Sequence, residues 1–405
     1  MYHFDELINR RNTNSLKWDV VEDGVIPLWV ADMDFPVLPE LQEALVKRAE
    51  HPFYGYKTNL GLIPGKTEGF YEAIRSWYKT RYDLTVETGH LLSGPGTVLS
   101  LGMIVREFSR EGEGVLLLTP VYTPFFEVVK ENRRKVVDVP MEPDEHGRFV
   151  LDTAAIEAGL AKAEEAGIKT PLALFCSPHN PGGRVWEREE IAAFLDLARR
   201  RNMIVASDEI HGDFVYAKNA AGKPQSFVSA ASLESYAERL IVVSGANKTF
   251  NLGGLHISHF VIRDAGLRRI MKTALHREAS HQGDVFSELA VETVYRQGVP
   301  WLTELHTYLG ENIREAVQLL NTVPGINAFV PDGTYLIWAD VRRLVEKTGS
   351  KNDAELVRRL EKEAKVKITA GSIYGDAGAG YVRINTASPR SQLVEGIRRI
   401  KAWAG

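Results

Sequence analysis

The chain has 405 residues, 44% of them hydrophobic and 25% charged, a composition typical of globular proteins and a length sufficient for two domains. The formal net charge of −4, with both signs mixed along the chain, excludes the basic stripe of a nucleic-acid-binding protein and the polybasic segment of a lipid-surface protein. Chemistry on a small molecule is therefore the class of function that we expect.

The single cysteine and the N-terminal residues indicate in which cellular compartment the protein is expected. Cys176 rules out a disulfide within the chain and a metal cluster with several cysteines, and its apolar surroundings predict a buried strand residue. Residues 1–12 lack the apolar core of a signal peptide, and the longest apolar runs are only as long as strands. We expect a cytoplasmic protein with no membrane span. The histidines match no zinc spacing, so we predict no metal site.

The first 110 residues predict a short strand and three helices. Residues 26–35 form an apolar strand that ends in an acidic turn, and helical spacing follows at 38–50 and 70–82. Asp32 and Asp34 in the turn favour either a metal or substrate loop or the cap of the next helix.

Small residues at 93–97 precede a third helix, whose start can offer free N–H groups to a phosphate. Most such starts bind nothing, and this one is neither a Walker loop nor a dinucleotide fingerprint.

From residue 114 to residue 263, short apolar strands alternate with amphipathic helices. This pattern predicts an α/β fold with a mostly parallel sheet that helices cover on both faces. Functional residues are then expected beyond the carboxyl ends of the strands, where polar residues gather at 119–122, 177–181, 208–211 and 244–248. Helices and a few strands after residue 263 predict a smaller α+β domain. We expect a large domain of residues 51–290 and a small domain of residues 1–50 and 291–405.

Lys248 follows an apolar strand in a polar turn. Partial desolvation there lowers the cost of the neutral, nucleophilic amine, which suits a Schiff base, although this segment alone is equally compatible with a surface lysine. Four strand ends together offer a lysine, a buried aspartate, an asparagine between prolines and an aromatic residue, beside a helix start for phosphate. These are the needs of pyridoxal phosphate.

At this point the chain resembles the fold-type I pyridoxal-phosphate enzymes of the class I/II aminotransferase superfamily, and among them the MalY/PatB type of cystathionine β-lyases, or C-S β-lyases. The motifs that carry the resemblance run in order through nearly the whole chain: ADMDF, YGY, SPHNPGGRVW, SDEIH, NKTFNLGGL and GYVRINTASPR. The resemblance implies a large domain that binds pyridoxal 5'-phosphate and a smaller α+β domain.

The resemblance also implies residue roles. Lys248 would hold the cofactor covalently and act as the base at the substrate Cα. Asp208 would keep the pyridine nitrogen protonated, Asn180 would donate to the phenolic oxygen, and Tyr122 would stack on the ring. Arg383 would bind the substrate α-carboxylate with a bidentate fork.

The phosphate would be held by the backbone amides of Gly96, Thr97 and Val98, with Ser244 or Asn247. Asn247 departs from the serine that relatives commonly have before the lysine.

Three further positions follow from the resemblance. His211 stands beside the cofactor where aminotransferases often have a tyrosine, and it fits the DEIH of the β-lyases. His256 lies near the position where some fold-type I enzymes have an arginine that binds the phosphate. Two roles stay open for it: it binds the phosphate, or it simply ends a buried strand. Tyr56 would contact the substrate and the phosphate of the neighbouring subunit, so the active sites would be shared in a homodimer.

The resemblance predicts a β-lyase that cleaves cystathionine, cysteine or cysteine S-conjugates to a thiol, pyruvate and ammonia. Two alternatives stay open. One is an aminotransferase on the same scaffold, because fold alone does not decide between the reactions. The other is a relative with an added regulatory role through protein contacts.

Overall fold

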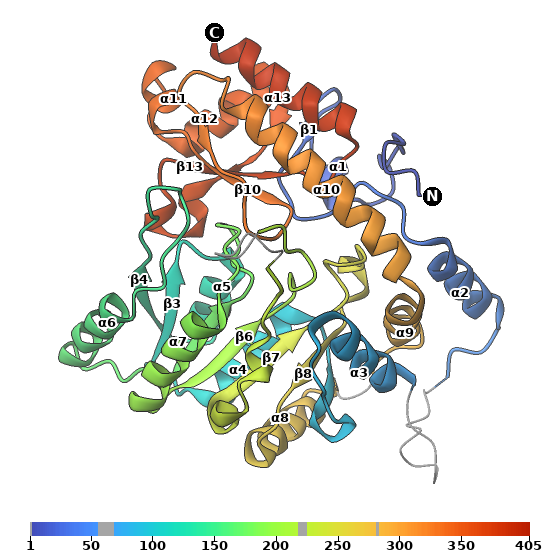
Figure 1. Ribbon diagram of the computed structural model, residues 1–405, viewed down its shortest axis with the longest axis vertical. Helices are drawn as coiled ribbons and strands as arrows, with labels where there is room; N and C mark the ends of the chain where they lie inside the picture. The colour runs from blue at the N-terminus through green and yellow to red at the C-terminus, as the bar shows by residue number, and fades with distance from the viewer. Residues whose placement is uncertain (1, 56–68, 218–224, 281–282) are drawn as a thin grey trace.

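The computed structural model describes residues 2–55, 69–217, 225–280 and 283–405. Figure 1 shows two regions, one built on a seven-stranded sheet and one on a four-stranded sheet. The long helix α10 (Val299–Leu320) joins them, since it contacts α9 (Ser287–Gln297) at one end and α13 (Arg390–Ala404) at the other. We call the two parts the large-sheet region and the small-sheet region.

The large sheet has the strand order β2-β8-β7-β6-β5-β3-β4, and only β8 runs antiparallel to its neighbours. The prediction of a mostly parallel sheet is therefore confirmed. The strand β2 was not predicted, because four residues ending in Ser-Gly carry too little apolar pattern, and its pairing with β8 makes it a strand. The strands are β2 (Leu91–Gly94), β3 (Gly114–Thr119), β4 (Lys135–Pro140), β5 (Leu172–Cys176), β6 (Ile204–Asp208), β7 (Leu240–Ser244) and β8 (Ser258–Val261).

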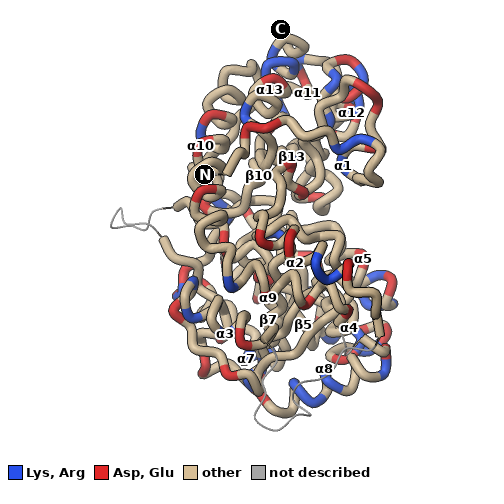
Figure 2. The backbone as a smooth tube through the Cα atoms, turned by 90° about the vertical axis from the view of Figure 1, so that its right-hand side faces the viewer, with Lys and Arg blue, Asp and Glu red and all other residues tan. Residues whose placement is uncertain are grey.

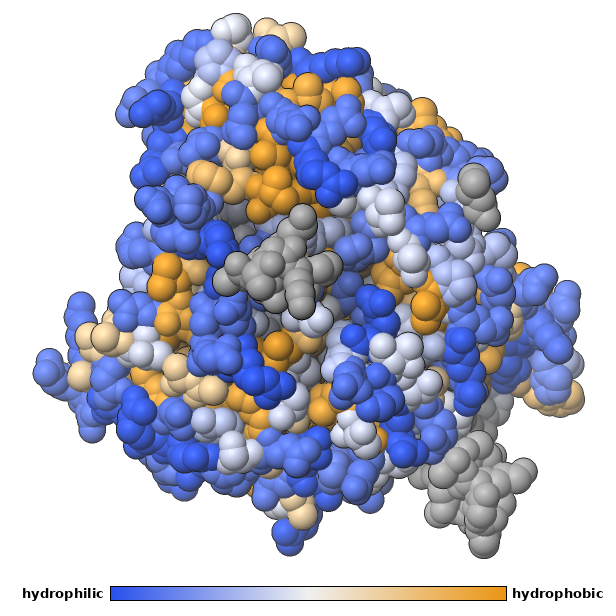
Figure 3. Space-filling model, in the orientation of Figure 1, coloured by the Kyte–Doolittle hydropathy of each residue, from blue (hydrophilic) through white to orange (hydrophobic). Residues whose placement is uncertain are grey.

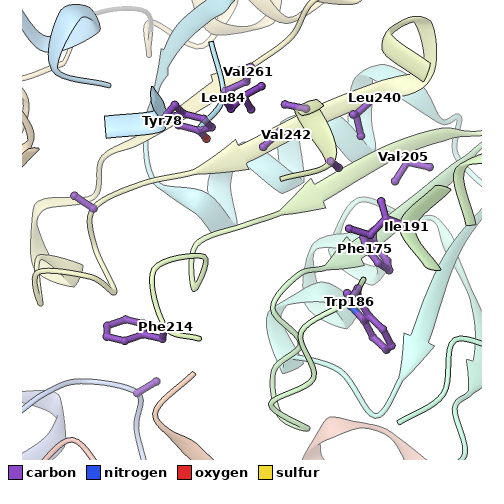
Figure 4. Close-up of a cluster of buried hydrophobic side chains, with 14 of the residues drawn as sticks. Tyr78, Leu84, Phe175, Trp186, Ile191, Val205, Phe214, Leu240, Val242 and Val261 are labelled. Atoms are coloured by element: carbon purple, nitrogen blue, oxygen red, sulfur yellow. The ribbon is translucent and has the colours of Figure 1, made fainter. Parts of the chain in front are cut away.

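Helices cover both faces of this sheet, which explains the uninterrupted apolar strands. In β5, Leu174 joins a buried cluster with α4, α5 and α8, whereas Phe175 joins a cluster with α3, α6 and α7. Figure 4 shows Phe175, Ile191 and Trp186 together in the second cluster. The helices are α3 (Gly69–Tyr82), α4 (Thr97–Phe108), α5 (Thr123–Glu131), α6 (Thr153–Glu165), α7 (Arg188–Arg200) and α8 (Ala265–Arg277).

The small-sheet region combines both ends of the chain. Its antiparallel strands run in the order β12-β13-β10-β9, and near the N-terminus β1 pairs in parallel with β11. Leu28 shares a core with Ile337 and Ile384, so the N-terminal segment belongs to this region. The elements are α1 (Leu16–Asp19), β1 (Ile26–Pro27), β9 (Asn327–Ala328), β10 (Leu336–Asp340), α11 (Arg342–Lys347), α12 (Asp353–Arg359), β11 (Val366–Lys367), β12 (Thr369–Ala370) and β13 (Tyr381–Asn385). The helix α2 (Pro39–Glu50) instead packs against α9, and its Leu41 belongs to the core cluster of the large sheet.

Two short helices were not predicted, α1 and α11, because four and six residues are too few for a periodic pattern. The domain limits at residues 50 and 290 stay a prediction. Lys, Arg, Asp and Glu alternate along the chain, and on the face shown in Figure 3 the hydrophilic surface is broken only by separate apolar patches (Figures 2 and 3). No helix in the described ranges combines the length and the apolar character needed to cross a bilayer.

Replacing Phe175 with alanine tests the core behind the sheet. Phe175 is 2% exposed and stacks on Phe194 with ring centroids 4.8 Å apart. Because the substitution leaves a cavity, we expect a loss of about 3 to 5 kcal/mol of unfolding free energy, measured by urea denaturation. The exposed control Val150→Ala should change it by less than about 0.5 kcal/mol. Equal effects of the two substitutions would contradict this packing.

Candidate active site

The parallel register brings the polar strand ends to one edge of the large sheet. Cys176 on β5 lies opposite Asp208 on β6, and Asp208 lies opposite Val243 on β7. The loops beyond these ends are bonded together, because the Tyr122 N–H donates to the Asn180 carbonyl at 3.0 Å. The structure therefore gathers the segments 119–122, 177–181, 208–211 and 244–248 at one place, as expected for parallel strands.

Burial moves the pKa values of Asp208 and Lys248 in opposite directions. Asp208 is 3% exposed, and loss of hydration raises its pKa to about 7, although the Ile210 N–H and the Lys248 charge oppose this rise. Burial, followed by the charge of Arg383, lowers the pKa of Lys248 to about 8. A lysine with this pKa is partly neutral near neutral pH and can act as nucleophile or base.

Arg383 reaches this edge from β13 of the small-sheet region. Its Nη1 donates to Asn180 Oδ1 at 3.0 Å, its Nη2 donates to the Trp29 carbonyl at 2.8 Å, and the Tyr374 ring centroid lies 5.1 Å from its Cζ. Its buried Nε has no partner among the described residues. Because a guanidinium has five N–H donors, several stay available for a carboxylate. The bond to Arg383 also orients Asn180, whose Nδ2 donates to no group in the described part of the chain.

Two rings flank these groups. Tyr122 is the residue before the first turn of α5, and burial raises the pKa of its hydroxyl against the opposing charge of Arg383. His211 is 2% exposed, and burial, together with the positive charges of Lys248 and Arg383, holds its pKa well below the usual value. His211 is thus a neutral imidazole, and its Nδ1 lacks a hydrogen-bond partner in the described part of the chain.

The start of α4 has the features of an anion cradle. Gly96 precedes the helix with a φ of 99° and no side-chain cap, so the first-turn amides of Thr97 and Val98 face outward without an intrahelical acceptor. The positive φ favours glycine here, whereas a Cβ would only reach ordinary contact with the His256 backbone at 3.4 Å. These free donors fit a phosphate.

Other predicted phosphate residues differ in how they are held. Ser244 Oγ donates to the Glu209 carbonyl at 3.2 Å and is mostly buried, while the buried Asn247 Oδ1 has no partner among the described residues. The side chain of His256 is exposed. The phosphate contacts of all three residues stay predictions. Tyr56, the predicted contact to a neighbouring subunit, lies outside the described residues.

Of the two alternatives for the acidic turn after β1, the one in which it caps the next helix is wrong. The residue that precedes α2 is Leu38, with no side-chain cap. Asp34 instead pairs with the fully buried Lys17 at 2.7 Å, and Asp32 pairs with Arg10 at 2.8 Å. Across the described ranges no group of three or more acidic, histidine or cysteine side chains could hold a metal ion.

Sequence reasoning missed several groups at the site. The Ala31 carbonyl accepts a hydrogen bond from Lys248 Nζ at 2.8 Å and another from the Tyr335 hydroxyl at 3.3 Å. The Tyr335 ring lies 5.7 Å from that of His211. A backbone carbonyl carries no residue signature, and an isolated tyrosine in an apolar strand looks like a core residue, so no pattern pointed to them.

The geometry and the comparisons agree on the class of protein. The family model for aminotransferase class I and II matches residues 24–400, so the chain belongs to this family. A crystal structure of a pyridoxal-phosphate-bound putative aminotransferase from Clostridium difficile superposes with a TM-score of 0.89 at 31% identity, covering 100% of both chains. The predicted fold-type I architecture is confirmed.

Within that family the similarity is to C-S lyases. Cystathionine beta-lyase PatB of Bacillus subtilis is 34% identical over 99% of both chains, and protein MalY of Escherichia coli is 32% identical over 98% of this chain and 97% of its own. Cystalysin from Treponema denticola, which contains pyridoxal 5'-phosphate, superposes with a TM-score of 0.88 at 30% identity, covering 99% of this chain and 98% of its own. The predicted MalY/PatB resemblance is confirmed.

The raised pKa of Asp208 predicts a pH-dependent stability of the apoprotein. Because the folded pKa of about 7 exceeds that of the unfolded chain, the folded form binds more protons, and stability is lost as pH rises from about 4 through 7. Asp208→Asn cannot ionise, so we expect it to lose less unfolding free energy between pH 5 and pH 8 in urea titrations. Each unit of pKa shift contributes about 1.4 kcal/mol. Parallel pH curves for the two apoproteins would contradict the assignment.

Proposed function

We propose that this protein is a pyridoxal-phosphate-dependent C-S β-lyase that cleaves cystathionine, cysteine or cysteine S-conjugates to a thiol, pyruvate and ammonia. The observation that carries the proposal is Lys248 in the turn after β7, because burial lowers its pKa to about 8 and its charge interacts with those of Asp208 and Arg383. The full-length similarity to cystathionine β-lyases and to pyridoxal-phosphate-bound C-S lyases supports the choice of reaction.

The large-sheet region would hold the cofactor. Bound pyridoxal phosphate supplies an electron sink that acidifies the hydrogen on the Cα of an amino acid. Asp208 would stand beside the ring nitrogen, where a cationic N–H favours the carboxylate and offsets the cost of its burial. Asn180 Nδ2 would donate to the phenolic oxygen, Tyr122 and His211 would flank the ring, and the α4 amides would bind the phosphate.

The small-sheet region would hold the substrate. Arg383 has the free donors for the α-carboxylate, and its bond to Asn180 couples the position of the substrate to that of the ring. Lys248 Nζ would then accept the Cα proton. As the electrons of the Cα–H bond form a Cα=Cβ double bond, the Cβ–S bond breaks and the thiolate leaves. Lys248 can return its proton to the sulfur, and hydrolysis of the released enamine gives pyruvate and ammonia.

An aminotransferase is the second candidate, favoured by the 31% identity to the Clostridium difficile putative aminotransferase. The two reactions share proton removal at Cα and differ afterwards. Elimination needs a leaving group at Cβ, whereas transamination needs a keto acid to regenerate the enzyme. A barrier difference of about 3 kcal/mol already gives more than a hundredfold preference.

With a sulfur amino acid as substrate, we expect elimination to be faster than transamination. Incubation of the enzyme with cystathionine, without a keto acid, should release pyruvate and free thiol together over many turnovers. Lys248→Ala should release neither, because it lacks both the attachment point and the base. A single half-turnover that restarts only when a keto acid is added would identify an aminotransferase instead.

We also propose a homodimer with shared active sites. Phe53 is 71% exposed and Tyr54 57%, and Phe53 and Gly55 line a cavity of about 440 Å³ with Arg48 and Asp284. Val98 and Leu99, at the phosphate end of α4, are 39% and 45% exposed. Apolar side chains exposed on two parts of the surface, one of them at the start of α4, support burial against a second copy. The cytoplasmic location and a regulatory protein-binding role stay predictions.

Hybrid dimers test the shared site. Lys248→Ala and Tyr56→Ala should each be inactive or nearly so. After the two are mixed and the subunits exchange, activity should return, because one site of each hybrid then has both residues. We expect the purified protein to sediment as a dimer. A fully active monomer, or a mixture that stays inactive after proven subunit exchange, would rule the arrangement out.

A further inference from the structure

Segment 29–34 supplies backbone carbonyl acceptors to Arg383 and Lys248, the two basic side chains proposed to act on the substrate. The Trp29 carbonyl accepts from Arg383 Nη2 at 2.8 Å, and two residues later the Ala31 carbonyl accepts from Lys248 Nζ at 2.8 Å. The Tyr335 hydroxyl, next to β10 of the small sheet, donates to the Ala31 carbonyl at 3.3 Å. The position of this short segment therefore determines where the two charged groups point.

The segment is held mainly by side chains. Asn385 Nδ2 donates to the Val30 carbonyl at 2.7 Å and to the Asp32 carbonyl at 2.9 Å. At the end of the segment Asp34 forms an ion pair with Lys17 at 2.7 Å, and Lys17 Nζ also donates to the Asp32 carbonyl at 2.9 Å. Lys17 is 0% exposed and Asp34 is 6% exposed.

A fully buried ion pair is a poor source of stability, because desolvation of the two charges offsets their attraction. The Lys17–Asp34 pair instead provides charged hydrogen-bonding groups that hold neighbouring segments in a defined orientation. Asp34 also accepts from Trp18 Nε1 and from Ser388 Oγ, each at 2.8 Å, so its carboxylate joins α1 and the segment after β13. Figure 1 shows α1 and β1 beside the small sheet, so this anchor ties the segment to the region that carries Arg383.

We propose that the buried Lys17–Asp34 ion pair is a positioning device for the catalytic lysine: it fixes the Ala31 carbonyl as the acceptor that holds the Lys248 amine whenever that amine is not bonded to the cofactor. This inference rests on the proposed role of Lys248 as the base. Lys17, Asp34 and Tyr335 are then positioning residues, since none of them acts on the substrate itself.

The direction of the amine follows from elementary chemistry. A neutral amine has two N–H bonds and one lone pair, and a carbonyl oxygen can only accept. With one N–H bonded to Ala31, the lone pair of Lys248 points away from that carbonyl and is free to take a proton. A lysine side chain has four rotatable carbons, so without this acceptor the freed amine would sample several rotamers. By fixing the Ala31 carbonyl, the Lys17–Asp34 ion pair reduces the number of rotamers that the Lys248 side chain samples.

The double variant Lys17→Met/Asp34→Asn removes both charges while keeping similar volumes and an acceptor for Trp18. Exchange of the α-hydrogen of L-alanine with deuterium in the holoenzyme, followed by NMR, reports proton transfer at Lys248 without needing a leaving group. We expect at least about a tenfold slower exchange, because small misplacements of a reacting group have effects of this size. The apoprotein variant should also capture pyridoxal phosphate more slowly, measured by absorbance.

Two further variants make the result decisive. Asn321→Ala breaks the bonds of the exposed Asn321 with the Ala328 backbone in the small-sheet region, away from segment 29–34, and should leave both rates within about twofold even if the melting temperature falls. Tyr335→Phe removes only one hydroxyl and should slow exchange in the same direction, by less than the double variant. This variant replaces the double variant as the test if the latter does not fold.

The outcomes separate the inference from the proposed function. If the wild-type enzyme does not exchange the α-hydrogen, Lys248 is not the base and the proposed function fails. If the wild type exchanges and a folded double variant, or Tyr335→Phe in its place, matches it in both exchange and cofactor capture, the positioning role is overturned. Slower exchange and capture with an unchanged melting temperature would support it.

Discussion

The desolvation of Lys248 and Asp208 at one edge of the large sheet is the constraint on which the site depends. Burial raises the pKa of Asp208 to about 7 and lowers that of Lys248 to about 8, so each group loses its charge more readily than it would in water. A cationic ring nitrogen and a carbonyl carbon are the partners that remove both costs. The parallel register of β5, β6 and β7 sets up this situation by ending three apolar strands at the same level.

The two regions divide the chemistry between them. Groups that suit the cofactor come from the large sheet, and Arg383, which suits the substrate, comes from β13. The bond between Arg383 and Asn180 joins these two sets of groups directly, and segment 29–34 adds a further connection through the Trp29 and Ala31 carbonyls. A shift between the regions would therefore change the placement of the substrate and of the lysine together.

Long periodic elements could be predicted, and short ones could not. The helices α7 and α10 and the strands β5 and β7 have enough residues for a clear pattern, whereas α1 and α11 are too short to show one and β2 is a strand through its pairing with β8. Among the site residues, Lys248 and Asp208 follow predicted strands. Lys17 gave no signal, because a lysine in a polar stretch is usually solvated and only the folded chain encloses it with Asp34.

The sequence by itself determined the order of strands and helices, the family and the residue types at the strand ends, since these depend on local pattern and on motifs that need no coordinates. Only the tertiary structure decided which acceptors meet those residues. The Ala31 carbonyl reaches Lys248 across 217 positions of chain, and Arg383 reaches Asn180 across 203. Such contacts depend on how two separately packed sheets are set against each other, and no local pattern encodes that relation.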